Sequence, residues 1–192
     1  MPASRIEWLS GDRRSREARL WSPWLRQLPR LRKQYSDVFE FDPLRSNETA
    51  SVGLLATAAG RAGLLTMAEY VAWKRAPGRG RPYRNGRCDL WVGHADSGTS
   101  WAFEFKQHFC ANRCRPATLT KHLDRAREDA RQVDSQEADR RFGGLIVSGW
   151  IDDPLPEMTV DAIEELARAS TFSCRVGGGS APVWLLFDEV GR

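Results

Sequence analysis

The sequence predicts an α/β (α+β) domain in which helices flank a mixed central sheet. Two observations predict this class. Segments with the alternating apolar pattern of strands follow segments whose apolar residues recur at helical three- and four-residue steps. Their order is helix, three strands, helix, strand, and then helix and strand. The chain has 192 residues, of which 41% are hydrophobic and 28% charged. This composition is typical of a folded globular chain with room for one sizeable core.

Residues 1–45 are predicted to form an N-terminal helical extension packed on a main domain of residues 46–192. Apolar residues recur here at three- and four-residue steps, at Trp8, Leu9, Leu20, Trp21, Trp24, Leu25, Leu28 and Leu31. This spacing predicts short amphipathic helices. We expect breaks near Gly11, Pro23 and Pro29, because glycine and proline interrupt helices.

The main domain is predicted to begin with a helix that ends near Ala59. Either Ser46 or Asn47 can cap its amino end, since both side chains accept a hydrogen bond from a free helical N–H. Glu48 follows in the first turn, where a carboxylate suits the helix dipole. Apolar and polar residues then alternate over residues 65–74, which predicts the first strand.

Two further strands are predicted after a turn-rich connection. The connection covers residues 76–86, which are rich in glycine, proline and arginine. Residues 87–92 and 100–107 have the composition of strands, and the turn at residues 96–98 joins them as a hairpin.

The rest of the domain is predicted to alternate between helix and strand. An apolar stripe at helical spacing predicts a helix over residues 117–134. Residues 144–150 form a short apolar run typical of a buried strand. A second helix is expected over residues 159–169 and a final strand over residues 183–190.

Charged side chains stand on the predicted hairpin where a core strand would carry apolar ones. The period of two puts Glu104 and Lys106 on the face opposite three aromatic residues, and it puts Asp89 opposite the apolar face of its own strand. Pairing of the two strands would let Asp89 and Glu104 converge. Two carboxylates about 4 Å apart repel each other unless a cation lies between them.

A hard divalent cation resolves this repulsion, and Mg²⁺ bound by one or two carboxylates and water is the usual solution. Mn²⁺ is an alternative ion for the same ligands. We expect Lys106 to orient or deprotonate a water molecule that attacks phosphorus. The metal would neutralise charge on the phosphate and acidify that water.

The pattern of Asp89, fourteen intervening residues and then Glu104-Phe105-Lys106 resembles the core of the PD-(D/E)xK, or restriction-endonuclease-like, nuclease superfamily. The resemblance covers about residues 46–150 and implies an αβββαβ core. It implies that Asp89 and Glu104 bind the metal, that the carbonyl of Phe105 adds a ligand, and that Lys106 assists the water. The proline that usually precedes the aspartate is absent, because Cys88 stands there.

The resemblance also implies that a glutamate of the first helix joins the metal site, and Glu48 is the residue that matches. Glu69, on the predicted strand of residues 65–74, competes with it for this role. A carboxylate in the first turn of a helix is also common for reasons of the dipole alone. Both glutamates therefore stay open as ligands, with Glu48 the preferred one.

The resemblance implies a Mg²⁺-dependent deoxyribonuclease that hydrolyses DNA phosphodiester bonds. A second hypothesis is a catalytically silent nuclease-like fold that acts as a nucleic-acid-binding or protein-binding accessory subunit. A third is an enzyme that acts on RNA or on a nucleotide. The hypothesis that Glu104 and Lys106 form only a solvated ion pair on an exposed sheet face, with Asp89 as a turn or edge residue, also stays open. A homodimer or a protein partner is compatible with all of them.

The formal net charge is +4, and its distribution along the chain is uneven. Residues 74–87 carry six bases and no acid, whereas residues 152–165 carry six acids and no base. This segregation is expected where one face of a protein meets a polyanion. We expect Arg79, Arg81 and Arg84 to contact the DNA backbone, and an ordinary solvated loop is the alternative.

Four possible zinc ligands follow the predicted catalytic strand. They are His108, Cys110, Cys114 and His122. The spacing lacks the Cys-x-x-Cys pattern of common zinc sites. We therefore expect free thiols and a histidine that contacts phosphate, with a zinc site as the lesser alternative.

The location predicted for the chain is the cytoplasm. No apolar run approaches the roughly 18 residues that span a bilayer, and the first residues lack the apolar core of a secretory signal. The 4 cysteines are too sparse for a disulfide-based scaffold. We expect no membrane partner.

Overall fold

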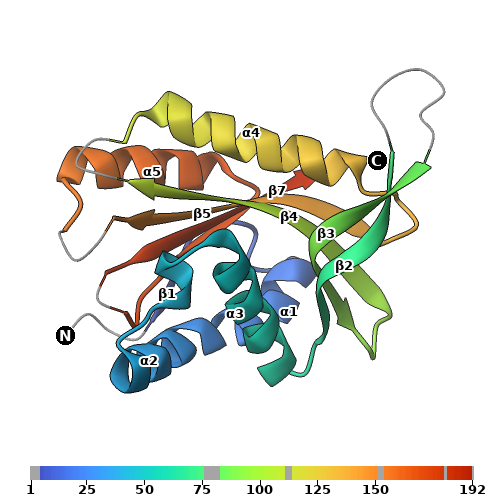
Figure 1. The fold of residues 1–192 in the computed structure, drawn as a ribbon, viewed down its shortest axis with the longest axis horizontal. Coiled ribbons are helices and arrows are strands. Elements are labelled where there is room, and N and C mark those ends of the chain that lie inside the picture. The colour runs from blue at the N-terminus through green and yellow to red at the C-terminus, as the bar shows by residue number, and fades with distance from the viewer. Residues whose placement is uncertain (1–4, 76–82, 111–113, 151–153, 180, 192) are drawn as a thin grey trace.

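The computed structural model describes residues 5–75, 83–110, 114–150, 154–179 and 181–191. They form a seven-stranded mixed sheet with helices on both faces (Figure 1), which confirms the predicted α/β class. The strands are β1 (Ile6–Ser10), β2 (Leu65–Arg75), β3 (Tyr83–His94), β4 (Thr99–Cys110), β5 (Arg140–Gly149), β6 (Phe172–Val176) and β7 (Val183–Val190). The helices are α1 (Arg16–Leu25), α2 (Gln27–Phe39), α3 (Glu48–Arg61), α4 (Pro116–Gln132) and α5 (Glu157–Ala169), and Pro43–Arg45 form a 3₁₀ turn.

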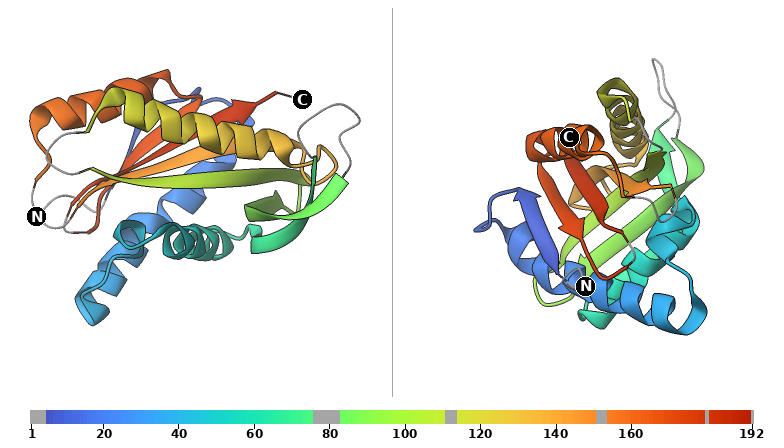
Figure 2. Two further views of the ribbon diagram at one scale, coloured as in Figure 1. Left: turned by 45° about the horizontal axis from the view of Figure 1, so that its top comes forward. Right: turned by 90° about the vertical axis from the view of Figure 1, so that its left-hand side faces the viewer.

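The sheet has the strand order β1-β6-β7-β5-β4-β3-β2. Among the strands of the described residues, β4 and β5 are the one parallel pair, and α4 is the helix of the crossover between them. Helices α4 and α5 lie on one face of the sheet, and α1, α2 and α3 lie on the other (Figures 1 and 2). The sheet is therefore the middle of three layers.

An aromatic core between the sheet and the N-terminal helices fixes the orientation of β4. Trp21 of α1 is fully buried and lies at the centre, with its ring centroid 5.0 Å from that of Phe142 and 5.4 Å from that of Phe103. Phe105 is also buried in this core. Because alternate residues of a strand face opposite sides, burial of Phe103 and Phe105 turns Glu104 toward the other face.

The first 45 residues are less helical than predicted. The expected helices are confirmed for α1 and α2, but helix is wrong for Ile6–Ser10, which pairs with β6 as an edge strand. The expected break near Gly11 is confirmed, because β1 ends at Ser10 and α1 begins at Arg16. Between the two prolines the chain breaks once, at Arg26, so that Pro23 lies inside α1 and Pro29 lies in the first turn of α2, where a free N–H would have no helical partner. Buried tryptophans on α1 stabilise that helix through packing.

The N-terminal helices share one hydrophobic core with the strands of the sheet. The division into an extension of residues 1–45 and a domain of residues 46–192 stays a prediction.

Several strands of the main domain differ in extent from the prediction. The β2–β3 ladder continues to the pair Arg75↔Tyr83, so residues 83–86 belong to a strand and not to the connection. Strand β5 begins at Arg140 instead of residue 144. Phe172–Val176 form an additional strand that pairs with both β1 and β7.

Candidate active site

The candidate site lies where β3 separates from β4. The ladder between these strands runs from the pair His94↔Thr99 to the pair Leu90↔Phe103. Beyond the last pair, β5 is the one described strand that still pairs with β4, while β3 stays paired with β2. The next residues along the two strands are Asp89 and Glu104. The β3–β4 ladder therefore ends at these two carboxylates, and this break in the ladder beside β4 is called the gap below.

Acidic side chains satisfy the backbone N–H groups that β4 presents to this gap. The N–H of Phe105 donates to Asp89 Oδ2 at 2.6 Å, and the N–H of Gln107 donates to Glu48 Oε2 at 3.1 Å. Glu48 is the first residue of α3, whose amino end is capped by Asn47 through a bond to the N–H of Ala50. Strand β3 and helix α3 thus bring two carboxylates to the edge of β4.

Glu104 is the most deeply buried carboxylate of the site, with a side chain that is 4% exposed. Its Oε1 atom forms an ion pair with Lys74 Nζ of β2 at 2.7 Å. Burial and the charge of Asp89 nevertheless raise the pKa of Glu104 to about 7.

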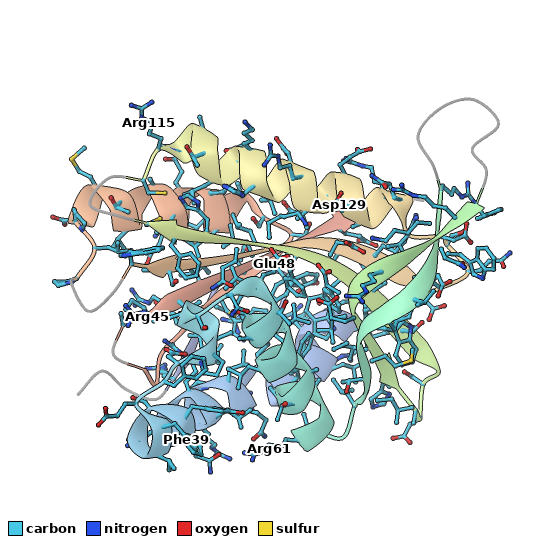
Figure 3. The ribbon with its side chains drawn as sticks, in the orientation of Figure 1. Phe39, Arg45, Glu48, Arg61, Arg115 and Asp129 are labelled. Atoms are coloured by element: carbon cyan, nitrogen blue, oxygen red, sulfur yellow. The ribbon has the colours of Figure 1, made fainter. Side chains whose placement is uncertain are left out.

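Lys106 connects β4 to α4. Its Nζ donates a hydrogen bond to the carbonyl oxygen of Phe105 at 3.0 Å and lies 2.9 Å from Asp129 Oδ2. Figure 3 shows Asp129 on α4 and Glu48 at the end of α3, on opposite sides of β4. Burial opposes the charge of Lys106, but the hydrogen bond and charge of Asp129 outweigh it and raise the pKa of this lysine. Its ammonium is therefore suited to orient a water molecule or phosphate and not to remove a proton.

The site carries unbalanced negative charge. Burial raises the pKa of Asp89. Burial also raises the pKa of Glu48, and the negative charge of Asp89 raises it further. Glu69 lies opposite Asp89 in the β2–β3 ladder, between the pairs Ala68↔Leu90 and Tyr70↔Cys88. Its charge also contributes to the raised pKa of Asp89.

Glu69 adopts a backbone conformation that is unusual for a strand. Its φ is 51°, in the left-handed region, and such a conformation costs about 1–3 kcal/mol for a residue other than glycine. Its carboxylate lies 3.7 Å from Arg87 Nη1. Glu48 contacts the backbone of β4 directly, whereas Glu69 is a neighbour on β2, and this difference favours Glu48 as the ligand.

The donor atoms at this site fit a hard divalent cation. The expected ligands are the carboxylates of Glu48, Asp89 and Glu104 and the carbonyl oxygen of Phe105, all of them oxygen atoms of the kind that Mg²⁺ and Mn²⁺ prefer. Burial, and to a lesser extent the charge of neighbouring carboxylates, raises the pKa values of these three groups, and a bound cation would favour their charged forms. The ammonium group of Lys74 contacts Glu104, and that of Lys106 contacts the carbonyl oxygen of Phe105. Metal binding would require both ammonium groups to move.

Two site residues were not singled out in the sequence, namely Lys74 and Asp129. Lys74 stands at the end of the predicted strand of residues 65–74, within the basic stretch of residues 74–87, and Asp129 lies on the predicted helix of residues 117–134. Each is paired with a residue at least 20 positions away, which no local pattern indicates.

The arginines expected to contact DNA are only partly described. Arg79 and Arg81 lie outside the described residues. Arg84 lies near the start of β3 and is exposed, and its Nη2 donates to Gln132 Oε1 at 3.2 Å. The structure thus holds Arg84 against the end of α4, on the same strand as Asp89.

The histidine and cysteine candidates also come together. One nitrogen of His108 and the sulfur atoms of Cys110 and Cys114 all lie within 4.8 Å of one another. The ring of His122, on α4, has its centroid 4.8 Å from that of His108. Burial lowers the pKa of both imidazoles, and the four cysteines of the chain are free thiols.

No family model, curated protein or solved structure matches this chain. None of the helices in the described ranges combines the length and apolar character needed to cross a lipid bilayer. The function is therefore inferred from the geometry and the chemistry of the site.

Proposed function

We propose that this protein is a metal-dependent nuclease that hydrolyses DNA phosphodiester bonds. The observation that carries the proposal is the gathering of Glu48, Asp89, Glu104 and Lys106 at the point where β3 leaves β4. The order α3, β2, β3, β4, α4, β5 matches the αβββαβ arrangement implied by the resemblance to the restriction-endonuclease-like superfamily. This agreement supports that core as the finer description of the fold.

Each residue of the proposed site has a distinct task. Glu48, Asp89 and Glu104, with the carbonyl of Phe105, would hold Mg²⁺ or Mn²⁺. When bound, such an ion supplies charge neutralisation for the phosphate and a more acidic water. The ammonium of Lys106 donates hydrogen bonds that orient the water or a phosphate oxygen. Its ion pair with Asp129 restricts the freedom of that ammonium.

The surroundings of the site favour a nucleic acid as the substrate. Arg87 is three-quarters exposed on β3, and cations at such positions attract the phosphate backbone. Trp73 and Tyr83 are more than half exposed and lie edge to face on the β2–β3 ribbon, with ring centroids 6.3 Å apart. Exposed aromatic rings of this kind are suited to contact bases or sugars.

The test is incubation of the purified protein with supercoiled, linear and single-stranded DNA in Mg²⁺ or Mn²⁺, with EDTA as the metal-free arm. We expect cleavage that EDTA abolishes and that Asp89→Asn and Lys106→Ala each slow about a hundred-fold or more. Asp96→Asn and Lys121→Ala are matched controls, because both residues are exposed and lie away from the gap. Cleavage by Asp89→Asn at the parent rate would refute the proposed mechanism.

A binding module without turnover is the second candidate. The observation that favours it is the ion pair between Lys74 and Glu104, because an ammonium already neutralises a proposed ligand without any metal. Calorimetric titration with Mg²⁺ and Mn²⁺ separates the two candidates. Binding at millimolar metal that Glu104→Gln weakens supports the nuclease, whereas no binding supports the module.

A further inference from the structure

The far end of β4 carries a second cluster of ligand-type side chains, which the proposed nuclease chemistry does not use. His108 and Cys110 follow Lys106 at every second position of the strand, so all three side chains leave β4 on the face that α4 covers. Cys114 precedes α4, and His122 lies in the second turn of that helix. Strand, connection and helix thus contribute ligands to one place.

The distances in this cluster are close to those of a bound tetrahedral ion. The ligand atoms of His108, Cys110 and Cys114 lie within 4.8 Å of one another. In a tetrahedral zinc site with Zn–S bonds of about 2.3 Å and Zn–N bonds of about 2.0 Å, ligand atoms are roughly 3.3–3.8 Å apart. Small side-chain movements would therefore bring the three atoms to bonding distance.

The fourth ligand is available on α4. The imidazole of His122 lies beside that of His108 with an interplanar angle of 36°, and rotation of its side chain would direct a nitrogen toward the cluster. Three residues separate the two cysteines, a spacing within the two-to-four range of structural zinc sites. Two thiolates and two neutral imidazoles form a Cys₂His₂ set, which balances the charge of Zn²⁺.

We propose that His108, Cys110, Cys114 and His122 form a structural Zn²⁺ site that fastens the end of β4 to the start of α4. Thiolates select zinc over the hard cations that the carboxylate site would take. Cys110 is buried and Cys114 is partly buried, which suits a closed, structural site. The inference does not depend on the proposed nuclease activity.

The test is a titration of the reduced, metal-stripped protein with Co²⁺, a spectroscopic substitute for Zn²⁺. We expect one equivalent of Co²⁺ to produce the visible bands of a tetrahedral ion and a near-ultraviolet thiolate-to-cobalt charge-transfer band. Zn²⁺ should displace the Co²⁺ and raise the melting temperature by several degrees, because a ligand that binds only the folded chain stabilises it.

Variants assign the ligands. Cys110→Ser and Cys114→Ser should each weaken the charge-transfer band, because each removes one of the two thiolates, and His122→Ala should alter the tetrahedral bands. Cys174→Ala is the matched control, because Cys174 is buried in the opposite core and should leave the spectrum unchanged. Asp89→Asn should also leave the charge-transfer band intact, which separates this site from the carboxylate site.

Three results would overturn the proposal. In the parent protein, one is an octahedral Co²⁺ spectrum without a charge-transfer band. The second, also in the parent protein, is a disulfide between Cys110 and Cys114 that forms readily in place of metal binding. The third is a charge-transfer band that keeps its full intensity in Cys110→Ser.

Discussion

Asp89 Oδ2 accepts a 2.6 Å hydrogen bond from the backbone N–H of Phe105, the residue that separates Glu104 from Lys106. Asp89 therefore replaces the missing strand partner of β4 at the point where β3 turns away. The same side chain maintains the gap and supplies a carboxylate to it. Structural and chemical roles of Asp89 can be separated by comparing two substitutions.

Asp89→Asn should fold normally and lose cleavage, whereas Asp89→Ala should also lose stability. The amide oxygen of asparagine can still accept the Phe105 N–H, but it lacks the charge that holds a metal. We expect the cleavage rate of Asp89→Asn to fall about a hundred-fold or more. Alanine leaves the N–H unpaired, which costs about 1–3 kcal/mol. Cleavage assays and denaturant unfolding check both expectations, and equal stability of the two variants would contradict them.

The stability of the metal-free protein should decrease as the pH rises from about 4.5 to about 7. Burial and the charge of Asp89 raise the pKa of Glu104 from the ordinary 4.5 to about 7 in the folded state. A raised pKa means that folding favours the protonated carboxyl. Its stabilising contribution is therefore complete below the unfolded pKa and is lost as the pH passes the folded pKa. The difference between the unfolded and folded pKa values of Glu104 corresponds to a loss of roughly 3 kcal/mol in the free energy of unfolding.

Glu104→Gln isolates this contribution, because glutamine stays neutral throughout. In EDTA, the unfolding free energy of the variant minus that of the parent should be larger at pH 8 than at pH 4.5 by roughly 3 kcal/mol. Glu128→Gln is the control, since Glu128 is exposed on α4. Unfolding curves at several pH values measure the effect. A difference between variant and parent that does not change with pH would show that Glu104 titrates normally.

Asp129→Asn should impair cleavage without abolishing it. Asp129 forms an ion pair with Lys106 at 2.9 Å and contributes to the raised pKa of that lysine. Loss of this charge should reduce kcat on the order of tenfold, as for other groups that orient a catalytic side chain. It should also lower the pH at which activity falls on the alkaline side. Asp124→Asn, on the same helix, is the control, and identical pH profiles for both variants would exclude a positioning role.

Lys74→Met should make stability depend strongly on divalent metal. Lys74 forms an ion pair with the buried Glu104, and removal of one partner of a buried pair costs about 3–5 kcal/mol. In EDTA at pH 8 we therefore expect a loss of this order. A bound Mg²⁺ would take over the neutralisation, so Mg²⁺ should restore much of the stability. Melting temperatures with EDTA and with Mg²⁺ measure this, and equal losses in both would contradict a metal at Glu104.

The sequence predicted the central elements of the fold but not its edge. Residues such as Phe103 and Phe105 alternate with charged ones, and this pattern alone defines β4 and its two faces. By contrast, Ile6–Ser10 forms a strand because it pairs with Phe172–Val176 at the other end of the chain. Pairing over such a separation leaves no local signal. Helix α1 continues for two residues past Pro23 for a related reason, since buried tryptophans stabilise it through tertiary packing.

The candidate site was predictable in its strand residues and not in their partners. Asp89, Glu104 and Lys106 were recognisable because charges interrupt apolar strands. The partners Lys74 and Asp129 follow from the curvature of β2 and the placement of α4, which the sequence does not display. The cysteine spacing likewise gave little indication that the crossover from β4 to α4 brings His108 and His122 together.

The most direct test of the central claim is a crystal structure of the protein with Mn²⁺, in which anomalous scattering locates the ion. We predict an anomalous peak bounded by the carboxylates of Asp89 and Glu104 and the carbonyl oxygen of Phe105, with Lys106 Nζ displaced from that oxygen. A map without a peak in this gap, with Lys74 still paired to Glu104 at saturating Mn²⁺, would contradict the account.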